Sequence, residues 1–278
     1  MRRFVASMVP DGMLITCADD AGAVSLAQRS RAAGLQVLTY GESEDADVRL
    51  SQITSHGSQS SSVLSWSFDL AGQHYSGEQE LNLQVPGVHN QLNAAASFAT
   101  ALVAGARPAD AASALGGFVG ADRRFTLRGE IAGIKVFDDY AHHPTEVLCA
   151  LQTGRTVAGG HNLYVVFQPH LFSRTKEFAQ EFAQALSLAD RAYVLDIYPA
   201  REEPIEGVTS ELITGAGFSE VHYASDATVA IDDIVTCASA GDIVMTVGAG
   251  DVTALGERFL EALTSRHGAS DEGDAGTK

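Results

Sequence analysis

The chain has 278 residues, of which 45% are hydrophobic and 7% aromatic, enough for one large or two modest globular domains. Its net charge of −17 argues against a surface that binds the phosphate backbone of nucleic acids, and no stretch approaches the roughly 18 apolar residues that a membrane helix needs. Three widely spaced cysteines without a CxxC pair, and a start without a secretory apolar core, predict reduced thiols in a cytoplasmic protein.

The first part of the chain predicts mixed α/β elements. Strands are expected at 13–17 and 35–40, with a helix at 21–33 between them. Apolar and polar residues then alternate, as in LSWSFDL, which predicts an antiparallel section from about 46 to 85. The Ser-rich stretch 55–62 is interpreted as a loop between its strands.

Two helices are expected to follow this section. The apolar residues of NQLNAAASFATALVAG have helical spacing, and Asn90 is the predicted N-cap. The second helix is expected to start at Pro108, because proline suits the first helical position.

From residue 131 onward, short apolar strands alternate with helices. Strands are expected at 134–138, 162–167, 192–197, 220–224 and 242–247, and helices near 144–153, 175–188, 209–215, 226–238 and 251–264. This alternation predicts a doubly wound, mostly parallel sheet covered on both faces. We therefore expect a domain boundary near 122, a partial α/β domain with an antiparallel section before it, and a polar, disordered tail at 266–278.

Polar clusters follow four of the predicted parallel strands. They are FDDYAHHP, QPHLFSRT (168–175), DIYPAREEP (196–204) and GAGD (248–251). Ligands of open parallel sheets bind beyond the carboxyl ends of the strands, so we expect these loops to come together at one edge.

Each cluster also has a plainer interpretation. Acidic residues before Pro144 suit a helix N-terminus, which leaves two histidines and a tyrosine unexplained, and adjacent histidines without HxxxH spacing argue against protein-bound zinc. Arg174 near a helix start opposes the helix dipole unless an anion lies between them; otherwise it is a solvated arginine. GAGDVTAL lacks the third glycine of a dinucleotide-binding motif and follows the last strand, which argues against NAD or FAD.

Taken together, the clusters resemble the Mur ligase family of ATP-dependent amide-forming enzymes. PGVHNQLNAAA, RRF, DDYAHHPTE, FQPHLFSRT, YPAREEPI and GAGD occur in that family's order and at about its spacing, over residues 1 to about 265. The resemblance implies that 1–122 is the second half of the central ATPase domain and that 123–265 is the Rossmann-like C-terminal domain. The best-matching branch joins L-alanine to UDP-N-acetylmuramate through an acyl phosphate during peptidoglycan synthesis, with ATP and Mg2+.

On the nucleotide side, the resemblance implies roles for five residues. His89, Asn90 and Asn93 are similar to the adenine contacts of the family, and an amide that both donates and accepts, as that of Asn93 does, suits an adenine edge. Arg124 resembles the arginine that reaches the nucleotide across the domain junction. Asp139 resembles the carboxylate that holds the ribose of ATP.

On the substrate side, the resemblance implies that Tyr140, His142, His170 and Arg174 face the amino acid and the muramoyl substrate, with His142 and Arg174 as the catalytic pair. One departure is Leu171, where the family pattern carries a cation. The resemblance implies no metal ligands here, because those for Mg2+ are expected mainly on a part of the family sequence that this chain does not contain.

A larger departure concerns the phosphate loop GxxxxGK[ST]. The three lysines, Lys135, Lys176 and Lys278, lie outside any such motif, so the chain is expected to be an N-terminally truncated fragment without the uridine-binding domain and inactive alone. Two alternatives stay open: a murein-peptide ligase of cell-wall recycling, which uses a tripeptide acceptor, and a non-catalytic binding remnant.

Overall fold

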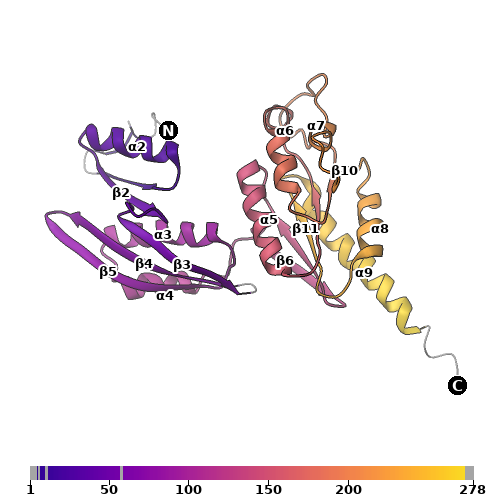
Figure 1. Cartoon of the computed structure of the whole chain (residues 1–278), viewed down its shortest axis with the longest axis horizontal. Helices are drawn as coiled ribbons and strands as arrows, with labels where there is room; N and C mark the ends of the chain where they lie inside the picture. The colour runs from indigo at the N-terminus through magenta and orange to yellow at the C-terminus, as the bar shows by residue number, and fades with distance from the viewer. Residues whose placement is uncertain (1–4, 6, 10–11, 57–58, 273–278) are drawn as a thin grey trace. The chain divides into compact units, whose positions relative to one another are not determined.

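The computed structural model describes residues 5, 7–9, 12–56 and 59–272, in two compact units, Met1–Val119 and Gly120–Lys278 (Figure 1). The first unit contains a five-stranded sheet in the order β1-β2-β3-β4-β5. Its strands are β1 (Met13–Cys17), β2 (Gln36–Gly41), β3 (Val48–His56), β4 (Gln59–Leu70) and β5 (Gln73–Leu83). The first three pair in parallel and the last two add antiparallel, as the alternating pattern predicts.

The helices of the first unit are α2 (Ala21–Ala32), α3 (Val88–Val103) and α4 (Pro108–Gly116). Every second residue of β4 is buried, and Trp66 packs against Phe98 of α3 with ring centroids 5.3 Å apart. The apolar stripe of α3 thus covers the apolar face of the antiparallel strands and forms the core of this unit.

The Ser-rich stretch is strand rather than loop, so the interpretation of 55–62 was wrong for its described residues; 57 and 58 lie outside them. Ser60 and Ser62 are buried in β4 and keep their hydroxyls satisfied. Ser60 Oγ donates to Val85 O (2.7 Å), and Ser62 Oγ donates to Gln91 Oε1 (2.7 Å). These long-range hydrogen bonds allow serine on the inner face of the sheet.

The predicted N-cap of α3 was also wrong. The cap is Gly87 (φ 96°), and Asn90 lies one turn into the helix, where its Nδ2 donates to Pro86 O at 2.7 Å. A glycine tolerates this positive φ, which brings the chain from Pro86 into the helix three residues earlier than the asparagine indicates.

The second unit is a six-stranded sheet in the order β10-β9-β8-β11-β7-β6, and the predicted doubly wound, mostly parallel fold is confirmed. The strands are β6 (Thr126–Ile131), β7 (Ile134–Asp139), β8 (Leu163–Phe167), β9 (Arg191–Val194), β10 (Val221–Tyr223) and β11 (Ile243–Val247). All neighbours pair in parallel except β6, which joins β7 antiparallel and was not predicted.

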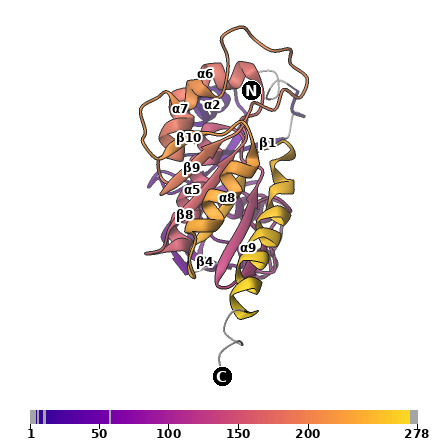
Figure 2. The ribbon, with the colours of Figure 1, turned by 90° about the vertical axis from the view of Figure 1, so that its right-hand side faces the viewer.

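Helices cover both faces of this sheet. They are α5 (Pro144–Ala158), α6 (Phe172–Leu186), α7 (Glu211–Thr214), α8 (Ala227–Cys237), the 3-10 turn η1 (Asp251–Ala254) and α9 (Leu255–Glu272). Figure 1 shows α5 and α6 on one side of the sheet, and Figure 2 shows α8 and α9 in front of the other. Each face has its own apolar core.

The predicted disorder of 266–278 is wrong for 266–272, which continue α9; residues 273–278 lie outside the described part of the chain. The guanidinium of Arg266 donates to Val235 O and to Ala238 O, the latter at 2.9 Å. These are carbonyls at the C-terminal end of α8, so the arginine fastens the polar segment to a neighbouring helix.

Candidate functional site at the carboxyl edge of the second sheet

Four neighbouring strands end at the same level of the sheet. Val247 of β11 is the register partner of Asp139 in β7 and of Phe167 in β8, and Phe167 is the partner of Val194 in β9. The polar segments that follow these strands therefore leave from one edge, here called the rim, as the sequence predicts for a doubly wound sheet.

Four predicted substrate-side residues lie together at the rim. The rings of Tyr140 and His142 are 5.2 Å apart, and those of His142 and His170 are 5.7 Å apart. Arg174, in the first turn of α6, donates to His142 O at 3.3 Å and lies 3.5 Å from His170 Nδ1. Segments from the ends of β7 and β8 thus build one cluster of two imidazoles, a phenol and a guanidinium.

The His142 ring is fixed by a backbone carbonyl. Its Nδ1 lies 2.9 Å from Tyr140 O and 3.4 Å from Glu146 Oε2. Because a carbonyl oxygen can only accept, Nδ1 carries the hydrogen of this bond, and a neutral His142 presents Nε2 as an acceptor. This bond holds the imidazole in one orientation.

The second histidine of the pair has a structural role. His143 is the N-cap of α5: its Nδ1 accepts from Thr145 N (3.4 Å), while Glu146 accepts from the backbone N–H of His143 (3.2 Å) in a capping box. Hydrogen bonds from the amides of His142 and His143, together with nearby positive charge, hold the pKa of Glu146 below its usual range despite partial burial. The helix-terminus interpretation thus accounts for one histidine and leaves His142 at the rim.

His170 is held by the segment that follows β9. It forms a parallel bridge with Tyr198, and the two rings stack with centroids 5.8 Å apart. Burial lowers the pKa of His170, and the positive charge of Arg174 and the proximity of His142 lower it further. The site therefore favours the neutral imidazole.

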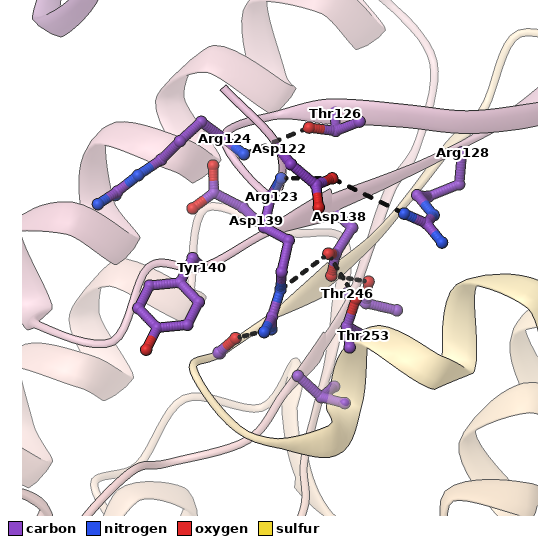
Figure 3. Close-up of polar contacts among 12 residues, drawn as sticks. Asp122, Arg123, Arg124, Thr126, Arg128, Asp138, Asp139, Tyr140, Thr246 and Thr253 are labelled. Atoms are coloured by element: carbon purple, nitrogen blue, oxygen red, sulfur yellow. Dashed lines mark hydrogen bonds and ion pairs between the residues drawn. The ribbon is translucent and has the colours of Figure 1, made fainter. Parts of the chain in front are cut away.

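Asp138 is the buried anchor of the rim. It is fully buried and accepts from Arg123 Nε (3.2 Å), Thr246 Oγ1 (2.8 Å) and Thr253 Oγ1 (2.7 Å). Arg123 also donates to Gly248 O at 2.6 Å, so one ion pair ties β7 to the glycine loop (Figure 3). Sequence reasoning carried over only Arg124 from the RRF motif and missed this clamp.

Both carboxylate oxygens of Asp139, the predicted ribose ligand, accept hydrogen bonds from the backbone. Its Oδ2 accepts from Phe125 N (2.8 Å) and its Oδ1 from Ala141 N (2.7 Å). Burial raises its pKa to about 6, although the two hydrogen bonds from backbone amides and the charge of Arg124 act in the opposite direction. Each carboxylate oxygen keeps a second lone pair, so binding of a hydroxyl is compatible with these bonds.

Arg124 projects away from the Arg123 clamp, as Figure 3 shows. Its side chain is half exposed, lies 4.0 Å from Glu146 Oε1, and is 6.0 Å from the centroid of the Tyr140 ring. The flanking residues Arg123 and Phe125 both have positive φ (57° and 51°), a strained arrangement that sends two consecutive arginines in different directions. The Arg123 guanidinium also lies over the Tyr140 ring, 4.8 Å from its centroid, and Arg124 is the more exposed of the two, so its contact with a nucleotide stays a prediction.

The glycine loop packs on the chain itself. Gly248 has φ 146°, and a Cβ there would lie 2.7 Å from Gln168 O. The side chain of Gln168 in turn donates a hydrogen bond from Nε2 to Asp251 Oδ1 (2.7 Å). Gly248 thus permits close approach between the segments after β11 and β8.

The N-terminus of α6 is occupied by a carboxylate of this chain. Leu171 is the N-cap but makes no side-chain cap bond, whereas Glu202 Oε2 accepts from Ser173 N at 2.9 Å. A carboxylate from the segment after β9 therefore already satisfies this amide, whereas Arg174 has no ion pair among the described residues and contacts His142 O and His170 Nδ1. Leu171 itself is buried and has φ 74°. Neither Glu202 nor Tyr198 was singled out from the sequence, because both act through contacts distant along the chain.

The remaining predicted residues belong to the first unit. Asn93 is exposed on α3, and Asn90 has committed its Nδ2 to Pro86 O. His89 lies in the first turn of the same helix. Because these residues lie in the other unit, their membership of one site with the rim stays a prediction.

In the part of the chain that the structure describes, no group of three or more His, Cys, Asp or Glu side chains is placed to hold a metal ion. Nor is any described helix long and apolar enough to cross a membrane.

Comparison with known proteins assigns the class. Residues 1–101 match the family described as the Mur ligase middle domain, and residues 123–250 match the glutamate ligase domain of Mur ligases. The two matches account for most of both units, and the chain belongs to the Mur ligase family.

Individual members of the family that resemble this chain are named as ligases of muramoyl substrates or murein peptides. The chain is 54% identical over 261 residues to UDP-N-acetylmuramate–L-alanine ligase of Paenarthrobacter aurescens strain TC1, covering 94% of this chain and 54% of the relative. The crystal structure of UDP-N-acetylmuramate–alanine ligase from Thermotoga maritima is 28% identical with a TM-score of 0.63, covering 82% of this chain and 48% of that one. The crystal structure of a murein peptide ligase from Psychrobacter arcticus is 26% identical with a TM-score of 0.63, covering 94% of this chain and 54% of that one. The chain thus spans about half the length of these relatives.

Proposed function

We propose that this chain supplies the adenine-binding and acceptor-binding parts of an ATP-dependent ligase that joins L-alanine to UDP-N-acetylmuramate in peptidoglycan synthesis. The observation that carries the proposal is the cluster of His142, His170 and Arg174 at the rim, beside Asp139 and Arg124. The similarity to relatives named for this reaction supports the choice of substrates.

The proposed roles follow from the chemistry of each side chain. Adenine lies against Asn93 with His89 and Asn90 beside it, the ribose hydroxyls meet Asp139, and Arg124 contacts the nucleotide. Tyr140 and His170 shape the seat for the acceptor and the muramoyl group. Arg174 supplies positive charge where the carboxylate of the amino acid and the reacting acyl phosphate both bring negative charge.

The amide-forming step needs a proton acceptor. The nitrogen lone pair of L-alanine forms the C–N bond to the acyl carbon of the acyl phosphate. The bond between that carbon and the oxygen that bridges to phosphorus breaks, and phosphate leaves with its electron pair. The proton released by the amine passes to His142 Nε2, which the bond from Nδ1 to Tyr140 O leaves free to accept it. Most of the remaining barrier reduction comes from positioning.

Mg2+, which the family resemblance implies, has no fitting ligand set here. Among the described residues no cluster of carboxylates or imidazoles is placed to hold it. Asp138 and Asp139 already accept hydrogen bonds with every carboxylate oxygen. The roles proposed for these residues therefore do not include metal ligation.

The nucleotide part of the proposal is tested by ligand-induced stabilisation. ATP should raise the Tm of the purified chain more than GTP does, because an amide that donates and accepts matches the adenine edge. Asn93→Asp keeps the size but loses the donor, so this preference for ATP should disappear. Asn82→Asp, an exposed site on β5, should retain it.

Two outcomes would contradict this assignment. One is a chain whose Tm does not respond to ATP, and the other is an Asn93→Asp variant with an unchanged preference for ATP over GTP. Because Asn93 is exposed, the substitution should leave the Tm without nucleotide unchanged.

A murein-peptide ligase is the second candidate. It is favoured by the similarity to the Psychrobacter arcticus protein, which covers 94% of this chain. The two candidates differ in the acceptor, and binding of L-alanine against binding of a tripeptide decides between them. Tighter binding of the tripeptide at the His142–His170 cluster would replace L-alanine in the proposal.

A further inference from the structure

The segment after β9 is fastened along the start of α6. Tyr198 N donates to Pro169 O (2.8 Å), and Leu171 N donates to Tyr198 O (3.0 Å). Further on, the carboxylate of Glu202 accepts from Ser173 N at 2.9 Å. Residues 198–202 and 169–173 therefore run side by side, and whatever lies between Tyr198 and Glu202 is held at the rim.

Arg201 lies in this fastened segment. It follows Ala200, whose positive φ of 51° turns the chain, and it is exposed. Among the described residues its guanidinium has no hydrogen bond and no ion pair, although Glu202 is its neighbour, because Glu202 is bound to Ser173. An arginine whose local carboxylate is already engaged has its donors available to a ligand.

Arg201 and Arg174 act on the same imidazole. Burial lowers the pKa of His170 first, and the charges of Arg174 and Arg201 both contribute to the lowering. Arg174 also has no carboxylate partner among the described residues; its contacts are His142 O and His170 Nδ1. Glu202 is the acidic group that acts on the same imidazole in the opposite direction. In a chain with net charge −17, two arginines that form no ion pair among the described residues thus share one part of the rim.

We propose that Arg201 is a specificity-determining residue that, with Arg174, binds the carboxylate of the incoming amino acid. This inference rests on the proposed function. An α-amino acid offers the site a carboxylate and the amine that must react, so the carboxylate is the charged group by which it can be held. Two guanidinium groups satisfy the oxygens of one carboxylate. Leu171, three residues before Arg174 in the chain, is buried and apolar and contributes no charge.

The proposal is tested on the intact chain by NMR titration of L-alanine, followed at the imidazole resonances of His142 and His170. Arg201→Met should weaken L-alanine binding by about tenfold, the loss expected for one charge-assisted hydrogen bond. Arg201→Lys keeps the charge and should recover part of the affinity. L-Alaninamide has no carboxylate, so its weaker binding should be the same in wild type and Arg201→Met.

Arg258→Met is the matched control for loss of an arginine. Arg258 is an exposed residue of α9 that donates to Thr228 Oγ1 (3.0 Å), on the face of the sheet opposite α6, and its loss should leave L-alanine binding unchanged. The pKa of His170 provides a reading that does not depend on the ligand. It should rise in Arg201→Met, because a nearby positive charge has been removed, and stay constant in Arg258→Met.

The outcomes distinguish a failure of the Arg201 assignment from a failure of the proposed function. If L-alanine perturbs His142 and His170 but binds Arg201→Met as tightly as wild type, Arg201 is not the second arginine and the proposed acceptor site stands. An unchanged pKa of His170 in Arg201→Met would also overturn the placement of Arg201. If L-alanine leaves both imidazoles of the wild-type chain unperturbed, the acceptor site and the inference fall together.

Discussion

Asp138 and Asp139 are adjacent carboxylates that the fold uses in different ways. Asp138 is fully buried, and its charge is met by Arg123 and two threonine hydroxyls. Asp139 accepts directly only from backbone amides, and burial raises its pKa to about 6. One residue therefore locks the strand end to the glycine loop, while the next gains or loses its charge near pH 6.

We expect Asp139 to lower the stability of its unit as the pH rises from about 4 to about 6. Its folded-state pKa of about 6 lies above the ordinary aspartate value of about 3.9, so the folded state binds more protons than the unfolded state in this window. The stabilisation present below pH 4 is lost through pH 6, by up to about 3 kcal/mol.

Urea unfolding of wild type and Asp139→Asn across this pH range measures the effect. Asparagine does not titrate, and at every pH it loses one of the two hydrogen bonds from backbone amides. The difference between the free energies of unfolding, wild type minus variant, should therefore fall as the pH rises. The groups whose pKa is lowered by folding, such as Glu146 and Asp233, cancel in this difference. A difference that is flat with pH would contradict the prediction.

At the scale of elements, two helices start at the rim with differently satisfied N-termini. The start of α5 is closed locally by His143 and Glu146, and the sequence placed it correctly at Pro144. The start of α6 depends on Glu202, 29 residues away in the sequence. The sequence predicted that helix from 175, whereas it begins at Phe172, because leucine at the N-cap gives no local signal.

The cap of α5 predicts a measurable stability effect. His143→Ala removes the acceptor for Thr145 N and should lower the free energy of unfolding by about 1 kcal/mol. His143→Asn restores a side-chain acceptor of a type preferred at N-caps and should recover the loss. The midpoints of urea unfolding of the three proteins give the comparison, and an alanine variant as stable as wild type would show that the cap contributes nothing.

Other elements show which interactions escape sequence reasoning. The strands β8 and β11 were predictable because each is a short, mostly apolar run whose five residues are all buried. The edge strand β6 has little apolar pattern and forms only by pairing with β7. The serines of β4 depend on hydrogen bonds to Val85 and Gln91. The site followed the same rule, since motif residues such as His142 were recognisable and the partners that fasten them were not.

At the scale of the whole molecule, each unit has a core of its own and carries a different part of the proposed site. The residues assigned to adenine lie on α3 of the first unit, and the acceptor residues lie at the rim of the second. The chain spans about half the length of its relatives, 54% of the Paenarthrobacter aurescens ligase.

We predict negligible ATP turnover by this chain alone. Its sequence contains no GxxxxGK[ST] loop, so the charge on a transferring phosphoryl group would lack the lysine that this motif supplies. Phosphate release in the presence of ATP, UDP-N-acetylmuramate and L-alanine measures this, with the Paenarthrobacter aurescens ligase as the positive control. Turnover comparable to that of the control would contradict the prediction.

The pairing of residues 169–173 with 198–202 constrains how this region tolerates changes in length. The backbones of Pro169 and Leu171 hydrogen-bond to that of Tyr198, and Ser173 N, in the first turn of α6, donates to the side chain of Glu202. One inserted residue in either segment would shift it against the other and break the match between these contacts. Insertions and deletions should therefore be excluded from these two segments.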